Sequence, residues 1–287
     1  MRLAAIATAA GVPDGGFAGT VAHVYPRVCL LGLADQTLVT LATSAVGHLP
    51  RGITLDSSAE FLSHVAPGSE FAARAGILRF SASTLSVDLR RSHRWQCDLT
   101  SLKLDINSVP VRQAWQAARD ALRRDGRSSG LQRAAGSAIR DLAAATRGFA
   151  AGAAGEIVSA LVGLGEGTTP AADDFLVGYV AGLLSSVGII EARARLVLTL
   201  CEQLKAAASR THRVSRLYLE AAAAGQISER LYALATCIAT GAGEETVTFA
   251  AEAALNVGHS SGACGILGLL IGCTAWENDG NAEWSNR

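Results

Sequence analysis

The segment Gly163–Leu184, GLGEGTTPAADDFLVGYVAGLL, decides how the second half of this chain folds. Its three alternating glycines permit backbone conformations that are closed to other residues. Thr169 and Pro170 are typical of the N-cap and the first position of a helix, and the apolar run Phe175–Leu184 continues that helix. Since a helix start leaves several N–H groups free, the segment predicts a helix whose N-terminus could hold an anion.

Alanine-rich segments with helical spacing surround this one. Gly178 and Gly182 share one helix face, so a neighbouring helix could approach closely. The pattern predicts a helical bundle domain over residues 108–287, and the polar closing segment Glu277–Arg287 is expected to fray. The predicted helices lie near residues 111–126, around 139, and at 154–162, 170–186, 190–207, 211–224, 228–240, 244–257 and 262–276.

The first half of the chain has the pattern of strands. Val28–Leu33 and Thr37–Leu41 flank a short polar turn, and Ile77–Phe80 and Leu85–Leu89 flank Ser81-Ala82-Ser83. Both pairs are predicted hairpins. The fold class is therefore predicted to be α+β, with an antiparallel β-rich sheet or barrel over residues 1–107 followed by the α-helical domain.

Composition restricts the class of protein. The chain has 287 residues, with 25 acidic and 25 basic side chains, so it lacks the positive field of a nucleic-acid or membrane-surface protein. The apolar run Leu3–Ala10 is short for a secretory signal and is predicted to be a first helix. Phe175–Leu184 has about half the length needed to cross a bilayer. Six cysteines without C-x-x-C spacing predict neither a zinc site nor a disulfide framework.

Asp173 and Asp174 follow the glycine loop. Adjacent helical residues point about 100° apart, so we place Asp173 on the Thr169 face and Asp174 towards Gly178. A carboxylate beside a bound anion needs a cation or an N–H donor between them. Asp173 is therefore predicted to bind substrate N–H groups or a metal ion such as Mg²⁺. The alternative is a favourable contact with the helix dipole in a structural capping loop.

Two further segments could take part in such a site. Gly258-His259-Ser260-Ser261-Gly262 is a second predicted helix start, where a serine could be the N-cap, or His259 could donate to an anion or move a proton. Arg210-Thr211-His212-Arg213-Val214-Ser215-Arg216 could neutralise an acidic or phosphorylated ligand, or form a solvated face. Neither a Walker motif nor a dinucleotide fingerprint is present, so no nucleotide is implied.

Together these motifs resemble, in the same order, the bacterial family that includes the AllH-type subunit of oxamate carbamoyltransferase. The residues that carry the resemblance are Gly163-Leu164-Gly165-x-Gly167-x-Thr169-Pro170-x-x-Asp173-Asp174-x-Leu176-x-Gly178, then Val214-Ser215, then Gly258 to Gly262. The resemblance implies a cytoplasmic protein of purine and allantoin degradation that works with FdrA-like partner subunits. Ala172, where the family usually has glycine, and Glu166, where proline is common, could alter the substrate.

The resemblance implies carbamoyl transfer as the function, in which oxalurate and phosphate are interconverted with oxamate and carbamoyl phosphate, or a related ureido acid reacts. The expected partners are this small anionic substrate and other subunits of an oligomer, with no nucleic acid and no membrane. The alternatives are a noncatalytic assembly or metabolite-binding subunit, or a stand-alone hydrolase of a carbamoylated or ureido compound.

The predicted catalytic residues have separate roles. Asp173 is expected to bind substrate nitrogen or a metal, Asp174 to fix the loop, and His259 to act as the general acid or base. The predicted substrate-binding residues are Gly163, Gly165, Gly167, Thr168, Thr169, Arg210, Thr211, Arg213, Ser215, Ser260, Ser261 and Gly262.

Overall fold

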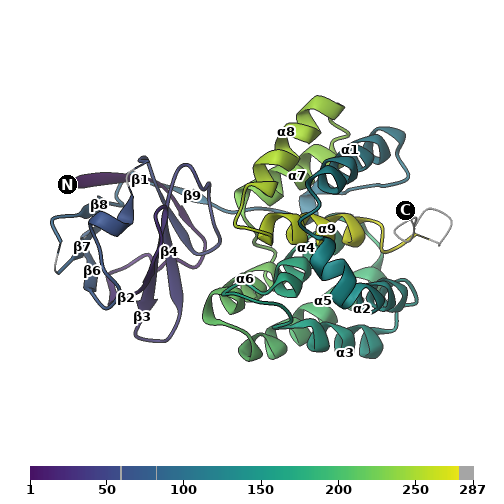
Figure 1. Ribbon diagram of the computed structural model, residues 1–287, viewed down its shortest axis with the longest axis horizontal. Coiled ribbons are helices and arrows are strands. Elements are labelled where there is room, and N and C mark those ends of the chain that lie inside the picture. The colour runs from purple at the N-terminus through teal and green to yellow at the C-terminus, as the bar shows by residue number, and fades with distance from the viewer. Residues whose placement is uncertain (59, 82, 278–287) are drawn as a thin grey trace. The chain divides into compact units, whose positions relative to one another are not determined.

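The structure is a computed structural model that describes residues 1–277 except residues 59 and 82. It contains two compact units, Met1–Cys97 and Asp98–Arg287. Residues 98–107, which the sequence pattern placed in the first domain, belong to the second unit. Ala82 of the second predicted turn and the closing segment after Glu277 lie outside the described residues. A β-rich first part followed by helices confirms the predicted α+β fold class (Figure 1).

The first unit is a closed β-barrel of eight strands, to which a ninth short strand is added. The described strands are β1 (Arg2–Ala9), β2 (Phe17–Val24), β3 (Val28–Leu33), β4 (Leu38–Thr43), β5 (Gly52–Leu55), β6 (Glu70–Arg74), β7 (Ile77–Phe80), β8 (Ser86–Asp88) and β9 (His93–Trp95). The hydrogen-bonded order is β5-β4-β3-β2-β6-β7-β8-β1, and pairing of β1 with β5 closes the ring.

Both predicted hairpins are confirmed, since β3 pairs antiparallel with β4 and β7 with β8. The predicted first helix is wrong, because its residues form strand β1. Ala5, Ala7 and Ala9 are buried at alternate positions, and pairing on both edges of the strand outweighs the helix propensity of alanine. The sheet is also not wholly antiparallel: β4 with β5, β1 with β8 and β1 with β9 are parallel pairs.

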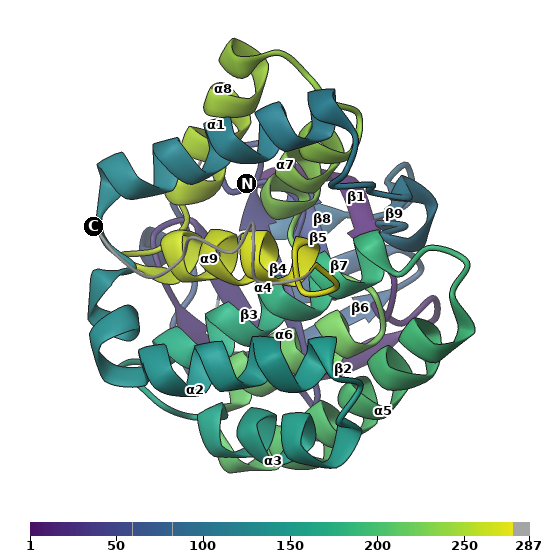
Figure 2. The same cartoon turned by 90° about the vertical axis from the view of Figure 1, so that its right-hand side faces the viewer.

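The second unit is a bundle of helices built around α4 and α9. Its described helices are α1 (Val109–Asp125), α2 (Ser129–Arg147), α3 (Ala151–Leu161), α4 (Ala171–Ser186), α5 (Glu191–Ala207), α6 (Arg213–Ala223), α7 (Glu229–Ala239), α8 (Glu244–Leu255) and α9 (Ser261–Cys273). Most residues of α4 and α9 are buried, and the other helices surround this pair (Figure 2). No helix in the described part of the chain is long and apolar enough to span a membrane.

Glycines bring α4 and α9 into backbone contact, as predicted for Gly178 and Gly182. A Cβ atom on Gly178 would lie 1.9 Å from the carbonyl oxygen of Gly265, and one on Gly182 would lie 2.4 Å from that of Leu269. Later residues of α4 therefore meet later residues of α9, so the two helices run in the same direction. Their N-termini consequently lie at the same end of the bundle.

Candidate functional site

The glycine loop folds back over the start of α4. Gly163, Gly165 and Gly167 have φ angles of 82°, 126° and 86°, which favour glycine. A Cβ atom on Gly165 would lie 2.7 Å from the backbone nitrogen of Ala171, so the loop passes directly over the helix end. Among the described residues, the N–H groups of 165–169 make no backbone hydrogen bond. They are therefore free for a ligand, as the anion-site prediction requires.

The start of α4 differs from the prediction. The helix begins at Ala171 with Pro170 at the N-cap position, and no side chain caps it, so the prediction that Thr169 is the N-cap is wrong. The Thr169 hydroxyl instead lies 3.1 Å from the hydroxyl of Ser261, the first residue of α9. This contact joins two helix starts that are far apart in the sequence.

Asp173 is buried and makes all its hydrogen bonds within the protein. Its Oδ1 accepts the N–H of Gly163 at 2.7 Å, and its Oδ2 accepts the hydroxyls of Thr211 at 2.5 Å and Ser215 at 2.6 Å. The side chain is only 1% exposed. Asp173 therefore ties the glycine loop to the start of α6, and it brings together two of the three predicted motifs.

Asp174 lies at the junction of α4 and α9. Burial raises the pKa of its carboxyl to about 7, while the hydroxyls of Ser261 and Thr169 lower it and the charge of Asp173 raises it. Its Oδ2 is buried and accepts no hydrogen bond from the part of the chain that the structure describes. A carboxyl group with a raised pKa and a free oxygen thus stands beside two hydroxyls and two helix N-termini.

The raised pKa of Asp174 should make stability depend on pH. From about pH 4 to pH 7 the unfolded chain binds fewer protons at this carboxyl than the folded chain, so the free energy of unfolding falls as pH rises. We expect urea unfolding to show a loss on the order of 2 kcal/mol between about pH 5 and pH 7.5, and expect no such loss in Asp174→Asn. The same pH dependence in both chains would contradict the raised pKa.

Arg127, which the sequence analysis did not single out, holds the turn before α9. Its guanidinium pairs with Asp125 at 2.5 Å and donates to the carbonyl oxygens of Leu255 and His259, each at 3.0 Å. The His259 side chain is exposed. Ser260 occupies the N-cap position of α9, but its side chain makes no capping hydrogen bond. The Asp125-Gly126-Arg127 sequence at a helix end was the only available signal for this contact.

The remaining predicted site residues differ in their exposure and in their contacts. Thr168 is exposed on the glycine loop, and Arg213 is exposed at the start of α6. Arg210 is also exposed, and its guanidinium donates to the carbonyl oxygen of Ser159. Gly262 packs against the backbone of Ala254, where a Cβ atom would lie 2.1 Å from the carbonyl oxygen, so its small size serves packing.

The described residues contain no group of three or more His, Cys, Asp or Glu side chains that could hold a metal ion. At the junction, the oxygens of Asp173 are occupied and Asp174 offers one free carboxylate oxygen. Cys264 is buried nearby, and burial together with the charge of Asp174 raises the pKa of its thiol to about 12. This thiol therefore stays protonated and is a packing group rather than a nucleophile or metal ligand.

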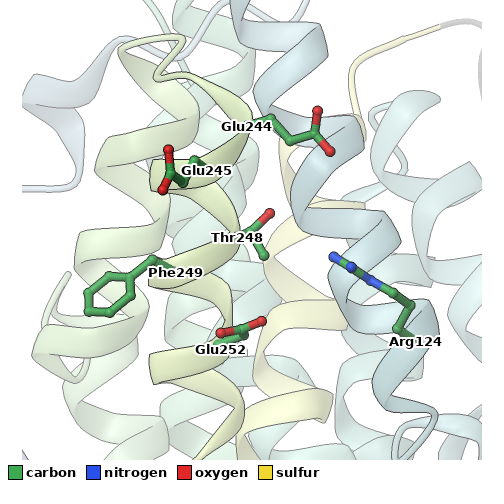
Figure 3. A pocket seen from close by; sticks show the side chains of 6 residues that line it. All are labelled: Arg124, Glu244, Glu245, Thr248, Phe249 and Glu252. Carbon is green, nitrogen blue, oxygen red and sulfur yellow. The ribbon is translucent and has the colours of Figure 1, made fainter.

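An open cleft elsewhere in the second unit contains none of the predicted site residues. Figure 3 shows Arg124 of α1 pointing towards α8, which contributes the rest of the lining: Glu244, Glu245, Thr248, Phe249 and Glu252. Three exposed carboxylates against one guanidinium would repel a phosphorylated or carboxylated ligand. The chemistry of the cleft therefore does not suit the anionic substrate that the motifs predict.

Two family models match the chain. Residues 161–273 match the model described as oxamate carbamoyltransferase subunit AllH, and residues 5–94 match the model described as the AllH family N-terminal domain. The first match contains the glycine loop, both aspartates and the start of α9. No curated protein and no solved structure gives a significant match.

Proposed function

Because this chain belongs to the AllH family, we propose that it is a subunit of an oxamate carbamoyltransferase and binds the carbamoyl donor at the junction of α4 and α9. The reaction would interconvert oxalurate and phosphate with oxamate and carbamoyl phosphate. All of these substrates are anions, and the organic ones also have an uncharged carbamoyl or amide group. The site must therefore hold negative charge beside a polar, uncharged group.

The observation that carries the proposal is the meeting of two parallel helix N-termini. Each N-terminus has a partial positive charge of roughly half an elementary charge, and the two lie side by side at the same end of the bundle. The hydroxyls of Thr169 and Ser261, 3.1 Å apart, each carry one proton, and both can turn from Asp174 to donate to one phosphate or carboxylate group. The free N–H groups of residues 165–169 add further donors from the loop.

Positioning and charge stabilisation would supply most of the catalysis at such a site. The protein holds the donor against fixed N–H and O–H groups, while the Asp173 network keeps the loop in place. Magnesium is usually bound by one or two carboxylates together with substrate phosphate and water. The oxygens of Asp173 already accept N–H and O–H groups of the protein, so a magnesium ion would have to reach the site on the phosphate of the donor, which titration with and without magnesium tests.

Calorimetric titration of the purified chain with carbamoyl phosphate, with and without magnesium, tests the donor site. We expect saturable binding that weakens by about tenfold to 100-fold in Thr169→Ala and in Ser261→Ala, because each change removes a hydrogen bond to a charged ligand. Thr248→Ala, in the acidic cleft on α8, is the matched control and should bind like the wild type. Equal affinity in all four chains would place the donor elsewhere.

The family description as a subunit favours a second proposal, that turnover requires partner subunits. A carbamoyl-transfer assay with oxamate should then show little activity for the chain alone and activity when an FdrA-like subunit is added. Binding without turnover in both cases would support the noncatalytic metabolite-binding alternative. Hydrolysis of the donor by the chain alone would favour the stand-alone hydrolase.

A further inference from the structure

Resting on this proposed function, we propose that Asp174, and not His259 or Asp173, exchanges a proton with the substrate during carbamoyl transfer. In this assignment Asp173 is a positioning residue. The roles are thus the reverse of those that the sequence pattern predicted for the two aspartates, and the exposed histidine has no part in the proton transfer.

Hydrogen bonding separates the two aspartates. The oxygens of Asp173 already accept three hydrogen bonds, from Gly163, Thr211 and Ser215, at 2.5–2.7 Å. Asp174 is the next residue in the sequence, but its carboxyl has different hydrogen-bond partners, the hydroxyls of Thr169 and Ser261. Its Oδ2 is buried without a partner among the described residues. A buried polar atom without a partner is costly, and a ligand group at the junction would satisfy it.

The surroundings of Asp174 suit a group that changes its protonation state near neutral pH. The groups that act on it are the carboxylate of Asp173, the two hydroxyls, and the protonated thiol of Cys264 on α9. Burial and the Asp173 charge disfavour the ionised form, while the hydroxyls favour it. The bound state adds the ligand's negative charge, which favours the protonated form further. His259, in contrast, has an exposed side chain, and its carbonyl oxygen accepts a hydrogen bond from Arg127.

The reaction needs such a group because two protons move. When oxalurate reacts with hydrogen phosphate, the bond between the carbamoyl carbon and the amide nitrogen breaks, and a bond from that carbon to a phosphate oxygen forms. The leaving nitrogen gains a proton to become the amide of oxamate, and the phosphate loses one. Asp174 as a carboxylic acid gives its proton to the nitrogen and, as a carboxylate, takes the phosphate proton, so it ends in its starting form.

Two measurements on the full chain test this assignment. Carbon-13 NMR of aspartate carboxyls in the free chain should show one group that titrates near pH 7 and disappears in Asp174→Asn. Calorimetry with carbamoyl phosphate at pH 7, in buffers with different ionisation enthalpies, should show uptake of roughly half a proton per ligand beyond that of Asp174→Asn. His259→Ala and the exposed control Asp141→Asn should keep both signals.

The possible outcomes separate this inference from the proposed function. A carboxyl of Asp174 that titrates near pH 4, or proton uptake that survives in Asp174→Asn and is lost in His259→Ala, would overturn the inference while leaving the donor site intact. No saturable binding by the wild-type chain would overturn the proposed donor site. The NMR titration needs no ligand, so it would still decide whether Asp174 holds a proton near neutral pH.

Discussion

Replacing Asp173 with alanine is expected to lower the free energy of unfolding by about 3–5 kcal/mol. The carboxylate is 1% exposed and accepts hydrogen bonds from Gly163, Thr211 and Ser215. Hydrogen bonds to a charged group contribute roughly 1.5–3 kcal/mol each, and donors left buried without an acceptor add a penalty. Rotation of the two hydroxyls towards other acceptors would recover part of the loss. Urea unfolding of both chains measures it.

Two variants make this prediction specific to the hydrogen-bond network. Asp173→Asn keeps the shape and one oxygen, so it should lose less, about 1–3 kcal/mol. Asp141→Ala removes an exposed carboxylate from α2 and should change the free energy of unfolding by no more than about 0.5 kcal/mol. If Asp173→Ala were as stable as Asp141→Ala, the network would have no structural role, and the sequence-based role of Asp173 in binding substrate would regain its support.

The sequence identified the segments that meet in the site but not how they meet. The glycine loop, the segment with Thr211 and Ser215, and the second helix start were each recognised from residue type. Their convergence depends on the parallel contact of α4 and α9 and on Asp173, which are long-range features. Gly178 and Gly182 predicted a close neighbour, but residue spacing does not identify that neighbour.

The roles of the two aspartates could not be predicted because the helix start was misplaced. The rule that residues four apart share a face holds only where both residues have helical backbone angles. Pro170 has a ψ angle of 141°, so Thr169 lies outside the helix and its direction is set by the loop. Thr169 therefore faces Ser261, beside Asp174, although the helical spacing placed it with Asp173.

In the first unit, the hairpins were predictable because each has its own short turn between two apolar segments. Barrel closure was not, since it depends on β1, whose alanine-rich sequence favours a helix when considered alone. The partners that make it a strand are β5 on one edge and β8 and β9 on the other, and Ala7 pairs with His93 and Ala9 with Trp95, far along the sequence. Local propensity is a weak guide where pairing of this kind decides the structure.

Replacing Gly178 with alanine is expected to destabilise the second unit by about 3 kcal/mol, because α9 leaves no space for a methyl group. The new Cβ atom would lie 1.9 Å from the carbonyl oxygen of Gly265 and 2.8 Å from the backbone nitrogen of Leu269. These are backbone atoms, which cannot rotate away, so the helices must separate. The gain in helix propensity from glycine to alanine, about 1 kcal/mol, is smaller than this cost.

Gly136→Ala is the matched control, since Gly136 lies inside α2 and a Cβ atom there would meet only the end of the Arg140 side chain, at 3.6 Å. This variant should gain about 0.5–1 kcal/mol in urea unfolding. Separation of α4 from α9 would also pull Thr169 away from Ser261, so Gly178→Ala should lose carbamoyl phosphate binding even where it remains folded. A folded Gly178→Ala chain with wild-type affinity would mean that the donor site does not depend on the contact between the two helices.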